Sequence, residues 1–255
     1  MKIIKVSLLL LLLALPSFSA DIKTGEDVVA AMYKKYAGKW YKTLTFVQKT
    51  ITHKPDGTDD VAIWYEAMTV PGKLRIDFAP LEKGDGMIFA DGKLFSYRDG
   101  KVAGSRPFVH PLMILGFDVY GQPVETTISQ ITGLKIDLAT VHQEKWQGRD
   151  VYVVGAKQGD MSVPQFWVDK KDMVFVRLIE LKGKDGKIVS ETQFNKYMKV
   201  KGGGMVSPEV VFIVDGKKTI TEEYSDIHAG MPLDADLWNP EKWLTVDKSY
   251  FKFTK

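Results

Sequence analysis

The 255-residue chain contains no cysteine, and this absence excludes several structural roles. Without thiols the chain forms no disulfide bond, and it offers no cysteine for a lipid anchor at a signal-peptide cleavage site. The absence of cysteine is also compatible with an oxidising compartment. If the chain is exported, we therefore expect it to be soluble and not lipid-anchored.

Residues with the chemistry of catalysis or metal binding are few. The four histidines show no metal-ligand spacing, and we expect each at the surface or in a loop: His53, His110, His142 and His228. No Gly-x-Ser-x-Gly sequence occurs, so nothing indicates a serine triad. Adjacent acids such as Glu222 and Glu223 would face opposite sides of a strand and form no dyad. The sequence predicts no catalytic residue, metal site or cofactor, and no enzyme.

A strong excess of charge is also missing. The formal net charge is +3, and it falls to +1 if the N-terminal segment that carries Lys2 and Lys5 is removed. Lysines and acids alternate along the rest of the chain, as on a solvated surface. Such a balance gives no electrostatic reason to expect a nucleic acid as partner.

The N-terminus is typical of a secretory signal peptide. A segment with two lysines precedes a leucine-rich run at 8–15, and small residues follow it. We expect residues 1–19 to be the signal peptide, with cleavage after Ser19. Cleavage after Ala20 and an uncleaved membrane anchor are the alternatives. In a bacterium the exported chain would reside in the periplasm.

Asp-Gly dipeptides predict the overall topology. Between apolar runs they favour tight reversals of the chain, because both residues tolerate positive φ. Six occur: Asp56-Gly57, Asp85-Gly86, Asp91-Gly92, Asp99-Gly100, Asp185-Gly186 and Asp215-Gly216. Together they predict one long antiparallel meander.

Helices are expected in two places. Thr24 and Asp27 form a capping-box pattern ahead of an apolar stripe, and Gly38 is placed to end that helix. In the middle of the chain, Pro111 and Pro123 are each placed to start a short helix. These segments carry apolar faces that must be covered.

The fold class we predict is mainly β (α+β), in a single domain over residues 20–255. About eleven strands in one open, twisted sheet tend to curl into an incomplete antiparallel β-barrel with a concave interior. The helices are expected to cover the concave face. The C-terminal tail, from Pro232, is expected to pack along the sheet edge.

A concave apolar interior could bind a ligand, or it could simply be a packed core. The candidate wall residues are Phe46, Trp64, Met68, Ile76, Phe78, Phe89, Phe95 and Phe166, and the candidate lid residues are Leu112, Met113 and Leu115. Methionine suits adaptable apolar sites. Where both strand faces are apolar, as at 61–70, alternation does not decide which face points inward.

Several segments resemble periplasmic lipoprotein carriers of the LolA type. The matching segments are Thr69-Val70-Pro71-Gly72-Lys73-Leu74-Arg75, the hairpin from Met87 to Tyr97, Phe166-Trp167-Val168-Asp169, and Leu233-Asp234-Ala235-Asp236-Leu237-Trp238. Their order covers nearly all of residues 20–255. The resemblance implies an incomplete barrel with helices over its opening, and binding of lipoprotein or lipid acyl chains inside it.

The resemblance also implies partners. A carrier of this type receives cargo from an inner-membrane donor complex and passes it to an outer-membrane acceptor, and we expect a monomer. One position departs from the pattern: in the better-known carriers of this type a basic residue that contacts the lid stands just before the turn proline, and the matching residue here is Val70.

Two functional hypotheses follow from this resemblance. In the first, the protein is a periplasmic carrier that binds acyl chains of a lipoprotein or lipid and transfers them toward the outer membrane. In the second, it is an envelope sensing or scaffold module that detects lipid or lipoprotein and signals to a protein partner. An envelope hydrolase is a third and weaker hypothesis.

Overall fold

The computed structural model describes residues 21–249. The expected signal peptide, residues 1–19, lies outside the described residues. The largest element is one antiparallel sheet of thirteen strands in the order β6-β5-β4-β3-β2-β1-β15-β14-β11-β10-β9-β8-β7. Most neighbours in the sheet are also neighbours in sequence, as a meander requires.

The long pair β1–β15 joins the two halves of this sheet. The first half comprises β1 (Thr43–His53), β2 (Asp59–Thr69), β3 (Lys73–Phe78), β4 (Gly86–Ala90), β5 (Lys93–Arg98) and β6 (Lys101–Pro107). The second half comprises β7 (Val141–Trp146), β8 (Arg149–Val154), β9 (Gln165–Asp169), β10 (Phe175–Lys182), β11 (Ile188–Asn195), β14 (Glu209–Val214) and β15 (Lys217–Ala229). A separate two-stranded sheet pairs β12 (Met198–Lys199) with β13 (Met205–Val206).

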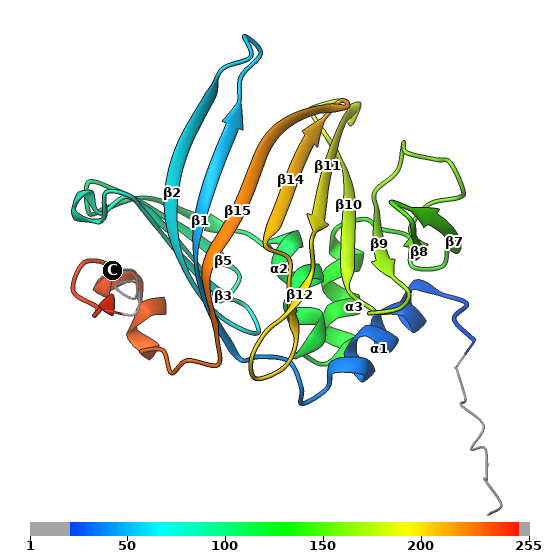
Figure 1. Ribbon diagram of the computed structural model, residues 1–255, viewed down its shortest axis with the longest axis horizontal. Helices are drawn as coiled ribbons and strands as arrows, with labels where there is room; N and C mark the ends of the chain where they lie inside the picture. Colours follow the sequence, from blue (N-terminus) through cyan, green and yellow to red (C-terminus); the bar gives the residue numbers. More distant parts are fainter. Residues whose placement is uncertain (1–20, 250–255) are drawn as a thin grey trace, which may run out of the picture.

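The predicted fold class is confirmed. The sheet does not close, since β6 and β7 are its edges, and it curves around the helices in the centre of Figure 1. It contains thirteen strands where about eleven were expected.

Three of the six Asp-Gly pairs form the expected two-residue hairpins. At Asp91-Gly92, Asp99-Gly100 and Asp215-Gly216 both residues have positive φ. Asp85-Gly86 is different, because a short 3-10 helix (Leu81–Lys83) makes the connection and Gly86 is already the first residue of β4. Asp85 instead accepts a hydrogen bond from the Asp99 N–H (2.7 Å). That pair was wrongly predicted as a tight turn.

Helix α1 (Gly25–Tyr36) begins as the sequence predicts. The Asp27 N–H donates to the Thr24 hydroxyl (3.2 Å), and the Thr24 N–H donates to the Asp27 carboxylate (2.9 Å). The stripe Val28, Met32 and Tyr36 is buried in the main core. The capping box therefore fixes where the helix starts, and the stripe fixes which face it buries.

The central segment forms the expected short helices over the concave face. They are α2 (Pro111–Gly116) and α3 (Val124–Gly133), with a 3-10 turn η2 (Asp118–Tyr120) between them. Figure 1 shows α2 and α3 inside the curve of the sheet. Ile114, Leu115 and Ile131 are fully or almost fully buried in the same core as the sheet.

The C-terminal tail was wrongly predicted to pack along the sheet edge. Its 3-10 turns η3 (Ala235–Trp238) and η4 (Pro240–Lys242) lie against the outer face of the first half of the sheet, at the left of Figure 1. Leu237, Trp238 and Trp243 form a second apolar cluster there with Ile88 and Tyr97. The end of β2 is therefore covered on both faces, which explains why both faces of the segment 61–70 contain apolar residues.

Among the described residues, no helix combines the length and the apolar character needed to cross a bilayer.

Candidate functional site

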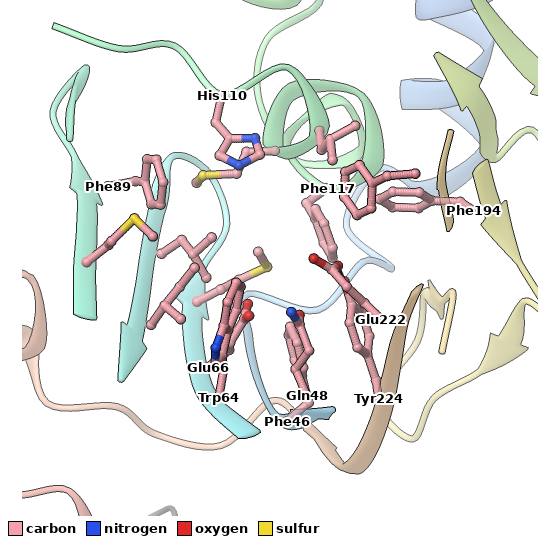
Figure 2. A pocket seen from close by; sticks show the side chains of 17 residues that line it. Phe46, Gln48, Trp64, Glu66, Phe89, His110, Phe117, Phe194, Glu222 and Tyr224 are labelled. Atoms are coloured by element: carbon pink, nitrogen blue, oxygen red, sulfur yellow. Dashed lines mark hydrogen bonds between the residues drawn. The ribbon is translucent and has the colours of Figure 1, made fainter. Parts of the chain in front are cut away.

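A cavity of about 200 Å³ lies between α2 and the inner face of the sheet. Figure 2 shows the lining side chains converging from both sides of the β1–β15 pair and from the lid. The lining comprises Phe46, Gln48, Trp64, Glu66, Met68, Leu74, Ile76, Met87, Phe89, His110, Leu112, Met113, Phe117, Phe194, Phe212, Glu222 and Tyr224. It is mostly apolar and aromatic, as is common for sites that bind small hydrophobic molecules.

Strand periodicity places these side chains. On β2, Trp64, Glu66 and Met68 are two residues apart and share the inner face, whereas Ala67 and Tyr65 belong to the outer cluster. The pairing of Phe46 with Glu66 and of Gln48 with Trp64 continues the inner face onto β1. The inner face of the first half-sheet is therefore the floor of the cavity.

The lid over this floor is α2 with the residue before it. Leu112 and Met113 contribute apolar side chains to the cavity, and Phe117 follows at the end of the helix. A hydrogen bond from the Gly72 N–H to the buried Asp118 carboxyl (3.0 Å) ties the lid segment to the turn between β2 and β3. Burial raises the pKa of Asp118 to about 7.

Seven of the eleven predicted site residues line this cavity. They are Phe46, Trp64, Met68, Ile76, Phe89, Leu112 and Met113. They come from four strands and from the lid, so residues distant in sequence are brought together as the half-barrel predicts. Their role in ligand binding stays a prediction.

The other four predicted residues lie outside the lining. Phe78 packs beside Trp64, with ring centroids 4.9 Å apart. Phe95 packs with the outer cluster under the C-terminal tail. Leu115 and Phe166 are fully buried in the main core. For these residues, hydrophobicity alone did not distinguish the cavity wall from ordinary packing.

His110 is placed differently from the sequence expectation. It precedes α2 in a connecting segment, but its ring lies in the cavity wall, edge-on to Phe89 with centroids 5.0 Å apart. Its Nδ1 atom is shut off from solvent and has no hydrogen-bond partner in residues 21–249. Burial lowers its pKa to about 4, so the ring is neutral at pH 7.

Sequence reasoning missed the polar residues of the cavity. Glu66 and Glu222 reach it from β2 and β15, near Gln48 and Tyr224. Burial raises the pKa of the Glu66 carboxyl well above its usual range, and the charge of Glu222 adds to this effect. The signal for Glu66 was present in the sequence, because it lies midway between Trp64 and Met68 and must share their face.

Val70, which stands where the family has a basic residue, is 8% exposed and belongs to the main core. It lies close to Gly121, just after η2. In this chain the contact between this position and the lid segment is therefore apolar.

Another hollow, of about 480 Å³, lies away from the lid, between the end of α3 and the β10–β11 turn. Lys135, Glu180 and Lys184 are among its lining residues. Its lining is more polar than that of the cavity under α2, which remains the better candidate for an apolar ligand.

Comparison with known proteins gives matches in structure only. No protein-family model matches the sequence, and no curated protein matches it. Among solved structures, a domain described as an outer membrane lipoprotein-sorting protein from Vibrio parahaemolyticus has a TM-score of 0.60 at 12% identity. The match covers 86% of this chain and 97% of that one.

Two further structures agree with the first. A LolA superfamily protein from Nitrosomonas europaea has a TM-score of 0.53 at 14% identity, covering 83% of this chain and 97% of that one. A DUF1329 family protein from Desulfovibrio piger has a TM-score of 0.57 at 14% identity, covering 84% and 95%. The chain therefore shares the fold of these three structures. The resemblance seen in the sequence is confirmed for the fold, and in this LolA-like fold the cavity lies under the covering helices.

Proposed function

We propose that the protein is a non-enzymatic periplasmic carrier that binds acyl chains of a lipoprotein or lipid and transfers them toward the outer membrane. The observation that carries the proposal is the apolar cavity between α2 and the inner face of a LolA-like half-barrel. The proposal includes a cleaved signal peptide, one domain over residues 20–255, a soluble monomer, and partners that donate and accept the cargo.

Binding would depend on apolar contact. Each buried methylene contributes roughly 0.8 kcal/mol, so an alkyl chain binds well without polar contacts to the chain itself. Loading of a long chain would widen the cavity of about 200 Å³ between the lid and the floor.

The lid and the floor are suited to such widening. Met68, Met87 and Met113 line the cavity, and their flexible side chains adapt to different shapes. The lid is one short helix, and a single hydrogen bond links Asp118 of the next turn to Gly72. When the lid closes, its own apolar side chains would compete for the same floor and help to release the cargo.

Extraction of the native ligand tests this function. The full chain is expressed with its signal sequence, purified from the envelope fraction without detergent, extracted with organic solvent, and the extract is examined by mass spectrometry. We expect lipid or acylated peptide in stoichiometric amount. A protein that retains no lipid and fails to keep an added lipoprotein soluble would contradict the proposal.

The sensing hypothesis and the carrier hypothesis differ in what deletion of the gene should do to the distribution of lipoproteins. A carrier's deletion would leave lipoproteins in the inner membrane, whereas deletion of a sensor would leave their distribution unchanged. Lipid in the extract together with an unchanged distribution, and an envelope protein that co-purifies, would favour the sensing module over the carrier.

A further inference from the structure

Two carboxyl groups face the cavity among its apolar side chains. Figure 2 shows the carboxyl groups of Glu66 and Glu222 pointing into the space between the floor and the lid. Glu66 is 4% exposed. A buried carboxyl group in apolar surroundings is costly unless it is paired, so the position of these two acids needs an explanation.

The partners of these two acids are unequal. The Tyr224 hydroxyl donates to the Glu222 carboxyl (3.1 Å), and hydrogen bonding from Gln48 also acts to lower the pKa of Glu222. Burial outweighs both and raises the pKa of Glu222 to about 7. Within residues 21–249, no side-chain hydrogen bond or ion pair engages the Glu66 carboxyl, so this buried acid faces the cavity with its bonding capacity unused.

No permanent positive charge in the lining balances the acids. Of the described lining residues only His110 can become a cation, and its ring is neutral at pH 7 because burial lowers its pKa. The neighbouring acid Glu223, on the outer side of β15, differs in this respect because it pairs with Lys49 (3.2 Å). The cavity is therefore lined mainly by apolar side chains, and its acidic part consists of the carboxyl groups of Glu66 and Glu222.

We propose that the cavity selects amphiphiles with a primary amine at the polar end, placed between Glu66 and Glu222, with the alkyl chain along the apolar wall. This inference rests on the proposed function and narrows its ligand class. An ammonium group supplies three N–H donors and a positive charge, which is what two unbalanced carboxyl groups require. A carboxylate or phosphate at the same place would find no cation, and it would be repelled by whichever of the two acids is ionised.

Binding should be linked to the release of protons. An alkylamine, with a pKa near that of lysine at about 10.4, stays charged, whereas the buried acids must ionise to pair with it. The facing titratable groups are Glu66 from β2, Glu222 and Tyr224 from β15, and His110 from the lid. Affinity for the amine should therefore rise as the pH increases from 5.5 to 7.5.

The test compares three probes with the same chain: decylamine, 1-decanol and decanoate. Their binding to the purified protein is measured by titration calorimetry at pH 7.0, in two buffers of different ionisation enthalpy. We expect decylamine to bind at least tenfold more tightly than 1-decanol, decanoate to bind most weakly, and proton release to accompany decylamine alone. This comparison uses the wild-type protein alone, so it does not depend on the folding of a variant.

Two substitutions test whether Glu66 and Glu222 cause the preference for the amine. Glu66→Gln and Glu222→Gln should each reduce the affinity for decylamine at least fivefold and leave 1-decanol within twofold. Glu223→Gln is the matched control, because it changes the adjacent residue on the outer face, and it should leave all three affinities unchanged.

The outcomes separate this inference from the function on which it rests. Equal affinities for the three probes, or a preference for decanoate or 1-decanol, would overturn the amine preference and leave an apolar carrier cavity intact. The proposal would also be overturned if Glu66→Gln and Glu222→Gln both preferred decylamine over 1-decanol as strongly as the wild-type protein does. Failure of all three probes to bind would contradict the carrier function itself.

Discussion

The two faces of the large sheet each bury ionisable side chains, and they treat them in opposite ways. On the outer face, under the C-terminal tail, Arg75 and Asp77 are almost completely buried and paired with each other. On the inner face, Glu66 and Glu222 are directed into a cavity without a cation. The outer pair is on β3, and the inner acids are on β2, which neighbours β3, and on β15, which β1 separates from β2.

The outer site is fully satisfied. The Asp77 carboxylate accepts from Arg75 Nε (2.7 Å) and Nη2 (3.0 Å), and from Lys248 Nζ (2.7 Å). The guanidinium group also donates to the Trp243 carbonyl (2.8 Å) and lies 3.9 Å from the centroid of the Trp243 ring. This network fastens the tail to the sheet.

The difference indicates which site is structural and which is available for a ligand. A buried ion pair with every donor and acceptor engaged has no capacity left for another molecule. A buried carboxyl group with no partner, beside a cavity, does have that capacity. Arg75 therefore has a structural role in holding the tail, and it is on the face opposite the lid.

The largest effect is expected at the outer site. Arg75→Met leaves Asp77 buried with Lys248 as its remaining cation, and should lower the free energy of unfolding by about 3–5 kcal/mol. Urea denaturation measures this loss. Arg98→Met, at an exposed position on β5, is the control and should change stability by less than about 0.5 kcal/mol. A loss below about 1 kcal/mol at Arg75 would contradict the structural role.

The inner site should make the protein more stable at mildly acidic pH. Burial raises the pKa of Glu222, and of Asp118 in the lid segment, to about 7, and it raises the pKa of Glu66 well above its usual range, so the folded state binds more protons than the unfolded state between about pH 4 and pH 7. Stability should therefore fall as pH rises through this window. His110, with its pKa lowered to about 4, acts in the opposite direction below about pH 6.5.

The net change is expected to favour pH 5.5 over pH 7.5 by roughly 2 kcal/mol, because the acids outnumber the histidine. Urea denaturation at the two pH values measures it. Glu222→Gln should reduce the difference by about half, and Glu223→Gln should leave it unchanged. A wild-type protein that is less stable at pH 5.5 would show that these acids are not buried as described.

Filling the cavity should abolish binding at a small cost in stability. Met87 lines the cavity and is only partly buried, so Met87→Trp adds volume there with an expected loss of about 1–2 kcal/mol in stability. Affinity for 1-decanol should fall at least tenfold in calorimetry. Met198→Trp, at an exposed methionine on β12, is the matched control. Binding that survives the filling would place the ligand elsewhere.

The smallest effect is expected away from both sites. Thr24→Ala removes the side chain that caps α1 and should cost about 1 kcal/mol in the free energy of unfolding, measured with urea. Because α1 does not line the cavity, affinity for 1-decanol should stay within twofold. A larger change in affinity would mean that α1 couples to the lid.

Local signals predicted much of this fold. The Asp-Gly hairpins, the Thr24 capping box and the proline-started helices each depend on a few neighbouring residues, and the structure contains them. The tail was misplaced because its docking depends on Arg75 and Trp243, which are far apart in sequence. No short-range pattern carries such a contact.

The cavity could be predicted only in part. Trp64 and Met68, chosen because they are large and apolar, line the cavity, whereas Phe95, chosen for the same reason, lies on the outer face, which is apolar beneath the tail. Glu66 and Glu222 were missed because their meeting depends on strand order: β2 and β15 both pair with β1. The one signal available in the sequence was that Glu66, an acid, lies at an inward-facing position of β2, between Trp64 and Met68.

The most direct test of the account is quenching of Trp64 by a bromine-labelled acyl chain. A monoacylglycerol with a brominated chain, added to the purified protein, should quench part of the tryptophan fluorescence, because Trp64 lines the cavity. In Trp64→Phe the same ligand should bind and that part of the quenching should be lost. Quenching that is unchanged in Trp64→Phe, or absent from the wild-type protein, would contradict binding of lipid under α2.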